Sequence, residues 1–150
     1  MKLAEALNLR ADIAKRISQL DSRLQSNAVV QEGEEPAEDP KSLLAELDTL
    51  VMQHEELIGI INLTNSQTIC EDKTLTEMIA HKDCLREKIS VMRDFLNTAS
   101  RTAQRGFRTE IRLLSTVNVA ELRKQVDKLE KEFRETDMKI QELNWNTELL

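Results

Sequence analysis

Residues 74–103, TLTEMIAHKDCLREKISVMRDFLNTASRTA, carry apolar side chains that recur in steps of three and four. This spacing is that of a heptad seam, in which one stripe of a long helix packs against a neighbouring helix. Thr74 and Glu77 are spaced as a capping box that would satisfy free backbone groups of the first turn. Lys82 is the one charged member of the seam. The seam comprises Leu75, Met78, Lys82, Leu85, Ile89, Met92, Leu96, Ala99 and Ala103.

A second segment, residues 41–64, follows Asp39 and Pro40, which favour a helix start as cap and first-turn residue. Its apolar side chains form three adjacent rows rather than one narrow stripe. A stripe of this width indicates packing on more than one neighbour. The rows are Leu43-Leu50-Leu57, Leu44-Val51-Ile58 and Leu47-His54-Ile61.

Two further segments have the helical period. Residues 2–25 place leucines and isoleucines on one side, and residues 119–143 continue in steps of three and four behind the capping pair Asn118 and Glu121. Charged residues make up 32% of the chain and aromatic residues 3%, a composition typical of long helices. We predict an all-α fold over a single domain, residues 1–150. Its four long helices, residues 2–25, 41–64, 75–103 and 119–143, would pack antiparallel as a bundle or coiled coil.

The connection at residues 107–117 alternates apolar and polar side chains, which predicts a β-strand. A lone strand needs a partner for its backbone groups, so we expect it to pair with residues 27–31, NAVVQ, or with its copy in another subunit. Ile111, Leu113 and Val117 would then lie at an oligomer interface. Lys82 joins these interface candidates, because one charge in an apolar seam can fix helix register or oligomeric state.

The net charge of −6 argues against a nucleic-acid partner and against binding to anionic membranes. Four arginines at positions 101–112 are suggestive of RNA contact, but the acidic residues at positions 32–39 would neutralise them. The first 16 residues contain no signal-peptide apolar region, and no run in the chain approaches 18 apolar residues, so we expect a cytoplasmic protein. Two cysteines, Cys70 and Cys84, are too few for a disulfide framework and are expected to be reduced thiols.

Amides and hydroxyls gather near the end of the second helix and near the C-terminus. We interpret them mainly as partners for helix ends and as a structural polar network. The alternative is a small-ligand site in which the one tryptophan stacks on the ligand. The candidate residues are Asn62, Thr64, Asn65, Asn144, Trp145 and Asn146.

His81, Cys84 and Glu77 share one helical face and are ligand types that zinc accepts. Their spacing matches no known zinc motif, so a solvated face is the favoured interpretation and no metal or other cofactor is expected. His54 lies alone in an apolar row, which favours a packed histidine over a ligand or proton-transfer group. No nucleophile–base pair, phosphate-binding glycine loop or paired-carboxylate motif is recognisable, so catalysis is not indicated.

Several phrases resemble a family of small bacterial proteins of unknown function that is often labelled septicolysin. They are MKLAEAL, VQEGEEPAEDP, LTNS before TLTE, STVNVAELRKQVD and KIQELNWNTELL, which together span nearly the whole chain. The resemblance implies an all-helical, oligomeric, soluble protein with no established activity or catalytic residue. The label suggests a thiol-activated pore-former, but neither Cys70 nor Cys84 matches a lysin motif.

These observations predict a non-catalytic structural or interaction protein that forms a homo-oligomer, a dimer or a hexamer. The second hypothesis is a ligand- or metal-binding protein or enzyme that uses the amide-rich end. The third hypothesis is the membrane-active lysin that the family label suggests. The sequence disfavours it because it lacks an export signal and the Trp-rich cysteine loop of such toxins.

Overall fold

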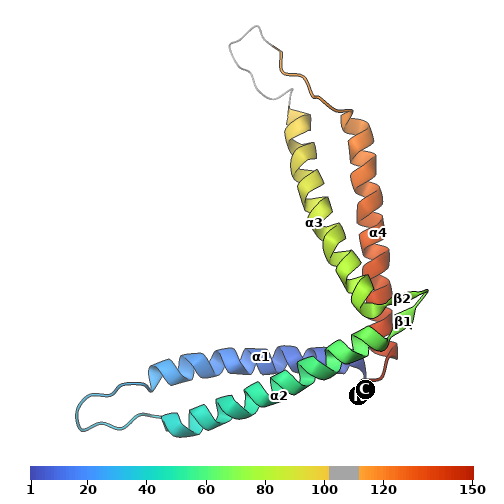
Figure 1. Cartoon of the computed structure of the whole chain (residues 1–150). Coiled ribbons are helices and arrows are strands. Elements are labelled where there is room, and N and C mark those ends of the chain that lie inside the picture. The colour runs from blue at the N-terminus through green and yellow to red at the C-terminus, as the bar shows by residue number, and fades with distance from the viewer. Residues whose placement is uncertain (102–111) are drawn as a thin grey trace. The chain divides into compact units, whose positions relative to one another are not determined.

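The computed structural model describes residues 1–101 and 112–150. Within these residues the chain forms four long helices and two strands of two residues each, which confirms the predicted all-α class with a small β element (Figure 1). The elements are α1 (Leu3–Ser26), α2 (Pro40–Gln67), β1 (Ile69–Cys70), β2 (Lys73–Thr74), α3 (Leu75–Ser100) and α4 (Val119–Asn146). None of the described helices combines the length and the apolar content needed to cross a bilayer.

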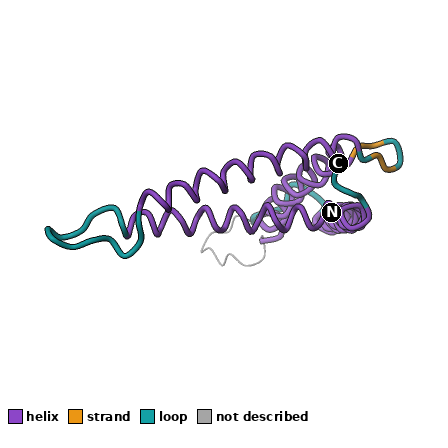
Figure 2. Tube along the Cα trace, turned by 90° about the horizontal axis from the view of Figure 1, so that it is seen from below, coloured by secondary structure: helices purple, strands orange, loops and turns teal. Residues whose placement is uncertain are grey.

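The chain divides into two compact units, each built on an antiparallel helix pair. Met1–Thr74 and Leu143–Leu150 form the first unit, and Leu75–Glu142 forms the second. In the first unit, α1 and α2 run side by side along their length (Figures 1 and 2). In the second, α3 lies beside α4 (Figure 1). A bundle that unites all four helices stays a prediction.

The core of the first unit is a heptad seam between α1 and α2. Ala6, Ile13 and Leu20 are buried on α1 at intervals of seven residues, and Leu43, Leu50 and Leu57 do the same on α2. Helices that match a seven-residue repeat pack in the near-antiparallel geometry of a coiled coil. Both rows end in a buried polar residue, Asn27 on the α1 side and Thr64 on the α2 side.

The connection between α1 and α2 is held by side chains at its base. Asn27 Nδ2 donates to the Arg23 carbonyl (2.8 Å), and Asn27 Oδ1 accepts from the Glu38 backbone N–H (3.0 Å). Arg23 Nε donates to Glu38 Oε2 (3.1 Å), and this hydrogen bond lowers the pKa of Glu38 below its ordinary value. Asp39 accepts from the backbone N–H of Ser42 (3.2 Å), which confirms the predicted cap of α2.

The first unit also takes in the end of the chain. Leu3 N–H donates to the Thr147 carbonyl (2.9 Å), and Leu149 N–H donates to the Met1 carbonyl (2.8 Å). Lys2 Nζ lies 2.6 Å from Glu148 Oε1, and this contact is the main reason that the pKa of Glu148 is lowered. Residues more than 140 positions apart in sequence therefore complete one structural unit.

α2 carries a second stripe beside the packed seam. Its members follow one another in steps of four and three and alternate between apolar and acidic residues: Leu44, Asp48, Val51, Glu55 and Ile58. Leu44 and Val51 keep 50% and 46% of their surface exposed. The sequence predicted that this helix packs on more than one neighbour, yet these two residues are only half covered. We refer to these five residues as the acidic stripe.

The second unit repeats the seam with fewer buried positions. Leu85, Ile89 and Leu96 are buried on α3, and Val126 and Ile140 are buried on α4. Lys82, the charge in the predicted seam, keeps only 15% of its side chain exposed. The Asn118 side chain accepts from the Glu121 N–H (3.1 Å), which confirms the predicted start of α4.

The β element lies elsewhere than the alternating sequence at residues 107–117 predicted. β1 and β2 form an antiparallel hairpin between α2 and α3, with Ile69 opposite Thr74 and Cys70 opposite Lys73. Residues 112–117 form no strand, and residues 107–111, including Ile111, lie outside the described residues. Residues 27–31, the expected partner strand, form no strand either. Residues 112–117 therefore have no strand at 27–31 with which to share backbone hydrogen bonds.

Candidate functional site

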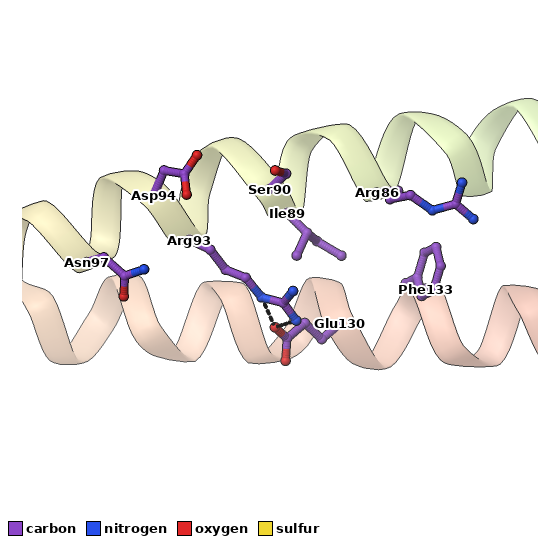
Figure 3. Close-up of a pocket in the computed structure, with 8 residues that line it drawn as sticks. All are labelled: Arg86, Ile89, Ser90, Arg93, Asp94, Asn97, Glu130 and Phe133. Carbon is purple, nitrogen blue, oxygen red and sulfur yellow. Dashed lines mark hydrogen bonds and ion pairs between the residues drawn. The ribbon is translucent and has the colours of Figure 1, made fainter.

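A groove of about 520 Å³ runs along the α3–α4 pair of the second unit (Figure 3). Its floor includes Ile89 and Phe133, one from each helix, and its walls are polar. The lining comprises Arg86, Ile89, Ser90, Arg93, Asp94, Asn97, Glu130 and Phe133. All eight residues belong to one compact unit, so the groove is a property of this helix pair alone.

Two arginines of α3 are held in place by residues of α4. Arg93 Nε donates to Glu130 Oε1 (2.6 Å), and a second nitrogen of the guanidinium contacts the same carboxylate (Figure 3). The Arg86 guanidinium carbon lies 5.5 Å from the centre of the Phe133 ring, within the range of a cation–π contact. Arg86 also has a 3.4 Å contact with Asp83 one turn earlier. Both arginines remain exposed to solvent, so they can contact a ligand or a partner.

Four of the five polar α3 residues in the groove, all except Asp94, form a stripe of their own. Arg86, Ser90, Arg93 and Asn97 follow one another in steps of four, three and four, so they lie on one helical face beside the seam. A guanidinium stripe above apolar side chains suits recognition of carboxylates and apolar groups together. The lining offers guanidinium, carboxylate, amide, hydroxyl and apolar groups.

Sequence reasoning did not identify this groove. Arg86 and Arg93 are ordinary exposed helix residues when each is considered alone. Their seven-residue spacing beside a seam is the signal that could have found them. That spacing becomes informative only when the seam itself is located, because it places both guanidinium groups along the same edge.

A second groove, of about 470 Å³, lies between α1 and α2 in the first unit. Most of its lining is apolar, with Arg16, Gln53 and Glu56 as polar members. The apolar members are Met1, Leu9, Ile13, Leu57, Ile60 and Leu149. It follows the opposite edge of the α1–α2 seam from the acidic stripe.

The predicted amide-rich site is partly brought together. The Leu150 backbone N–H donates to Thr64 Oγ1 (3.3 Å), and Thr64 Oγ1 donates to the Ile60 carbonyl (2.8 Å). These bonds use the Thr64 hydroxyl for the chain's own backbone. Asn144 is buried and Asn65 half-buried, whereas Asn62, Asn146 and Trp145 are exposed, Trp145 to 57%. Within the described residues no hydrogen bond links these amides to one another, and a ligand site here stays a prediction.

The predicted metal candidates lie on the second unit. His81 Nε2 is 3.0 Å from Glu132 Oε1, so its partner belongs to the facing helix. Cys84 is exposed and its thiol is free. Among the described residues no group of three His, Cys, Asp or Glu side chains, including Glu77, is arranged to hold a metal ion. His54 is half-buried in the α1–α2 seam.

The predicted interface residues are dispersed. Leu113 is exposed and Val117 is half-buried in the segment that precedes α4. Ser115 Oγ donates to the Val117 carbonyl (3.0 Å), which gives this segment a local turn. Lys82 Nζ lies 3.0 Å from Asp137 Oδ1 of α4. Whether any of these residues contacts another subunit stays a prediction.

Comparison with known proteins defines a family and leaves its role open. The model of a family described as "Family of unknown function (DUF6847)" matches residues 10–149, and the chain belongs to this family. A crystal structure of a functionally unknown conserved protein from Corynebacterium diphtheriae is 39% identical in sequence and has a TM-score of 0.93. That similarity covers 100% of this chain and 99% of the other. No curated protein matches the chain.

Proposed function

We propose that the protein is a non-catalytic interaction protein that works as a homo-oligomer. The observation that supports this proposal is the half-exposed state of Leu44 and Val51 on α2. They repeat at seven residues, parallel to the packed row Leu43-Leu50-Leu57. Isolated exposed leucines need no explanation, but an apolar row with coiled-coil spacing is the pattern that binds another helix.

Burial of this row would be favourable. Each of these side chains would gain roughly 1 kcal/mol from covering its remaining apolar surface, at about 25 cal/mol per Å². Partner helices in a dimer or a hexamer would supply that cover. The chemistry of the α3–α4 groove agrees with a binding role, because its guanidinium groups lie beside apolar side chains.

Native mass spectrometry of the purified full chain, across a range of concentrations, tests the proposal. We expect a defined dimer or hexamer without a bound small molecule. The variant Leu44→Ser with Val51→Ser should shift the population towards monomer. The matched variant Met52→Ser removes an apolar side chain that is 71% exposed on the same helix, outside the row, and should leave the assembly unchanged. A wild-type chain that stays monomeric throughout the range contradicts the proposal.

A further inference from the structure

We infer that the α3–α4 groove receives the acidic stripe of α2 from a second copy of the chain. This inference rests on the proposed self-association and names the two surfaces that meet. One surface is the groove that contains Arg86 and Arg93. The other is the stripe Leu44-Asp48-Val51-Glu55-Ile58, with its two half-exposed apolar residues and two exposed acids.

The two surfaces have matching spacing. Asp48 and Glu55 are seven residues apart on α2, and Arg86 and Arg93 are seven residues apart on α3. Seven residues of α-helix span about 10.5 Å, so both carboxylates can meet both guanidinium groups when the helices lie nearly parallel or antiparallel. Between these two acids α2 offers Val51, and Leu44 precedes Asp48 by one turn.

The apolar parts of the two surfaces also correspond. The groove offers Ile89 between the two arginine positions of α3, and Phe133 of α4 beside Arg86 (Figure 3). Leu44 and Val51 would cover the groove floor in the way that seam residues of one helix fill the holes of another. The contact therefore alternates apolar contacts with charged pairs along one face of each helix.

The charges on both sides are available. Asp48 and Glu55 have no ion pair within the described residues. Arg86 contacts Asp83 at 3.4 Å and lies over Phe133, and both contacts leave N–H groups of the guanidinium open. Arg93 uses two of its nitrogens for Glu130, which fixes the guanidinium and leaves further donors for a second carboxylate.

The net charges of the two compact units also favour a contact between the first unit of one copy and the second unit of another. The first unit contains seven basic and fifteen acidic residues, a net charge of −8. The second contains fourteen basic and twelve acidic residues, a net charge of +2. Like units of two copies would repel one another, whereas unlike units attract. A pair of copies related by a two-fold axis forms the unlike contact twice and closes the assembly.

Two charge-reversal variants of the full chain test the contact. The acidic-stripe variant is Asp48→Arg with Glu55→Arg. The groove variant is Arg86→Glu with Arg93→Glu and Glu130→Arg, the last change being included so that the pair between positions 93 and 130 persists with inverted charge. Each variant alone opposes like charges in both contacts of a dimer. We expect its dissociation constant to rise at least about tenfold over wild type.

An equal mixture of the two variants is the decisive sample. In a mixed pair, one contact joins the inverted stripe to the inverted groove, and the other contact is wild type on both sides. We expect native mass spectrometry to show recovery of the wild-type assembly with both variants present in equal numbers. A variant that had merely unfolded would not recover on mixing, and circular dichroism of each variant checks its helix content directly.

The control is Asp12→Lys with Glu87→Lys. It changes the net charge as much as the acidic-stripe variant does, at exposed positions outside both surfaces, and should assemble like wild type. If wild type assembles but the mixture fails to recover, or if neither variant weakens assembly, this inference is wrong and the proposed function stands. A wild-type monomer would overturn both.

Discussion

Lys82 Nζ lies 3.0 Å from Asp137 Oδ1, so the one charge in the α3 seam is paired with a carboxylate of the facing helix. The lysine keeps 15% of its side chain exposed, and the aspartate 40%. A single paired charge in an apolar seam can favour one register of the two helices, because a shift by one heptad would separate the ammonium from Asp137. The pair therefore specifies how the α3–α4 hairpin aligns.

Loss of one partner should cost more than loss of both. Asp137→Ala leaves the mostly buried ammonium of Lys82 unpaired, and we expect it to lower the free energy of unfolding by about 1 kcal/mol. Lys82→Met with Asp137→Ala replaces the pair with an apolar seam and should be neutral or stabilising. Urea unfolding followed by circular dichroism measures both. A double variant less stable than Asp137→Ala would contradict this account.

The seam of the first unit should dominate its stability. Leu50 is buried at the middle of the α2 row, so Leu50→Ala should lower the free energy of unfolding by about 2–4 kcal/mol through lost burial and a cavity. Met52→Ala, on the same helix but exposed, should change it by less than about 0.5 kcal/mol. Chemical unfolding of both variants gives the comparison. Equal effects would show that the α1–α2 seam is not the core.

Acid should weaken the loop between α1 and α2. Arg23 lowers the pKa of Glu38 from its ordinary 4.5 mainly through a side-chain hydrogen bond. A carboxyl with a lowered folded-state pKa contributes stability that is present above pH 4.5 and is lost as the pH falls through the folded value. The thermal unfolding temperature should therefore fall more steeply between pH 6 and pH 3 for wild type than for Glu38→Gln.

The control for this pH series is Glu35→Gln. Glu35 lies in the same loop, is exposed, and has no ion pair within the described residues. The unfolding temperature of Glu35→Gln should depend on pH as steeply as that of wild type. Identical slopes for all three proteins would mean that the pair between Arg23 and Glu38 does not contribute to folding.

The hydroxyl of Thr64 should slow the hydrogen exchange of the Leu150 amide at the end of the chain. It accepts a hydrogen bond from the Leu150 N–H at 3.3 Å, at a position where the threonine is almost fully buried. Thr64→Val keeps the shape but removes the acceptor, so the Leu150 amide should exchange its hydrogen faster, by about fivefold or more for a bond of roughly 1 kcal/mol. Amide exchange measured by NMR reports this. Ser66→Ala, a nearby exposed hydroxyl, should leave the rate unchanged.

Helix positions were predictable because burial imposes a period on the sequence. The seams through Leu43, Leu50 and Leu57 and through Leu85, Ile89 and Leu96 repeat at helical spacing, and the structure buries these residues. The β hairpin was not predictable, since strands of two residues are too short to show a period. Its turn has positive φ at Glu71 and Asp72, a conformation for which Asn-Gly is the usual sequence. The chain therefore offered no turn signal there.

The candidate site was harder to predict than the fold. A groove depends on which side chains of two helices meet, and no single segment contains that information. Arg93 could be identified as an exposed helix residue, but its fixed position depends on Glu130, which lies 37 residues further along the chain. Amides such as Asn62 and Asn146 attracted attention by composition alone, yet the structure leaves them exposed rather than in a network.

The closing of the first unit by Leu143–Leu150 has a consequence for the order of folding. The hydrogen bond from Leu3 to Thr147 joins positions separated by nearly the whole chain, so it forms only after everything between them has been synthesised. A nascent α1–α2 pair must wait for α4 before its edge is sealed, which makes long-range closure a late step. Completion of the first unit therefore has to follow synthesis of the second.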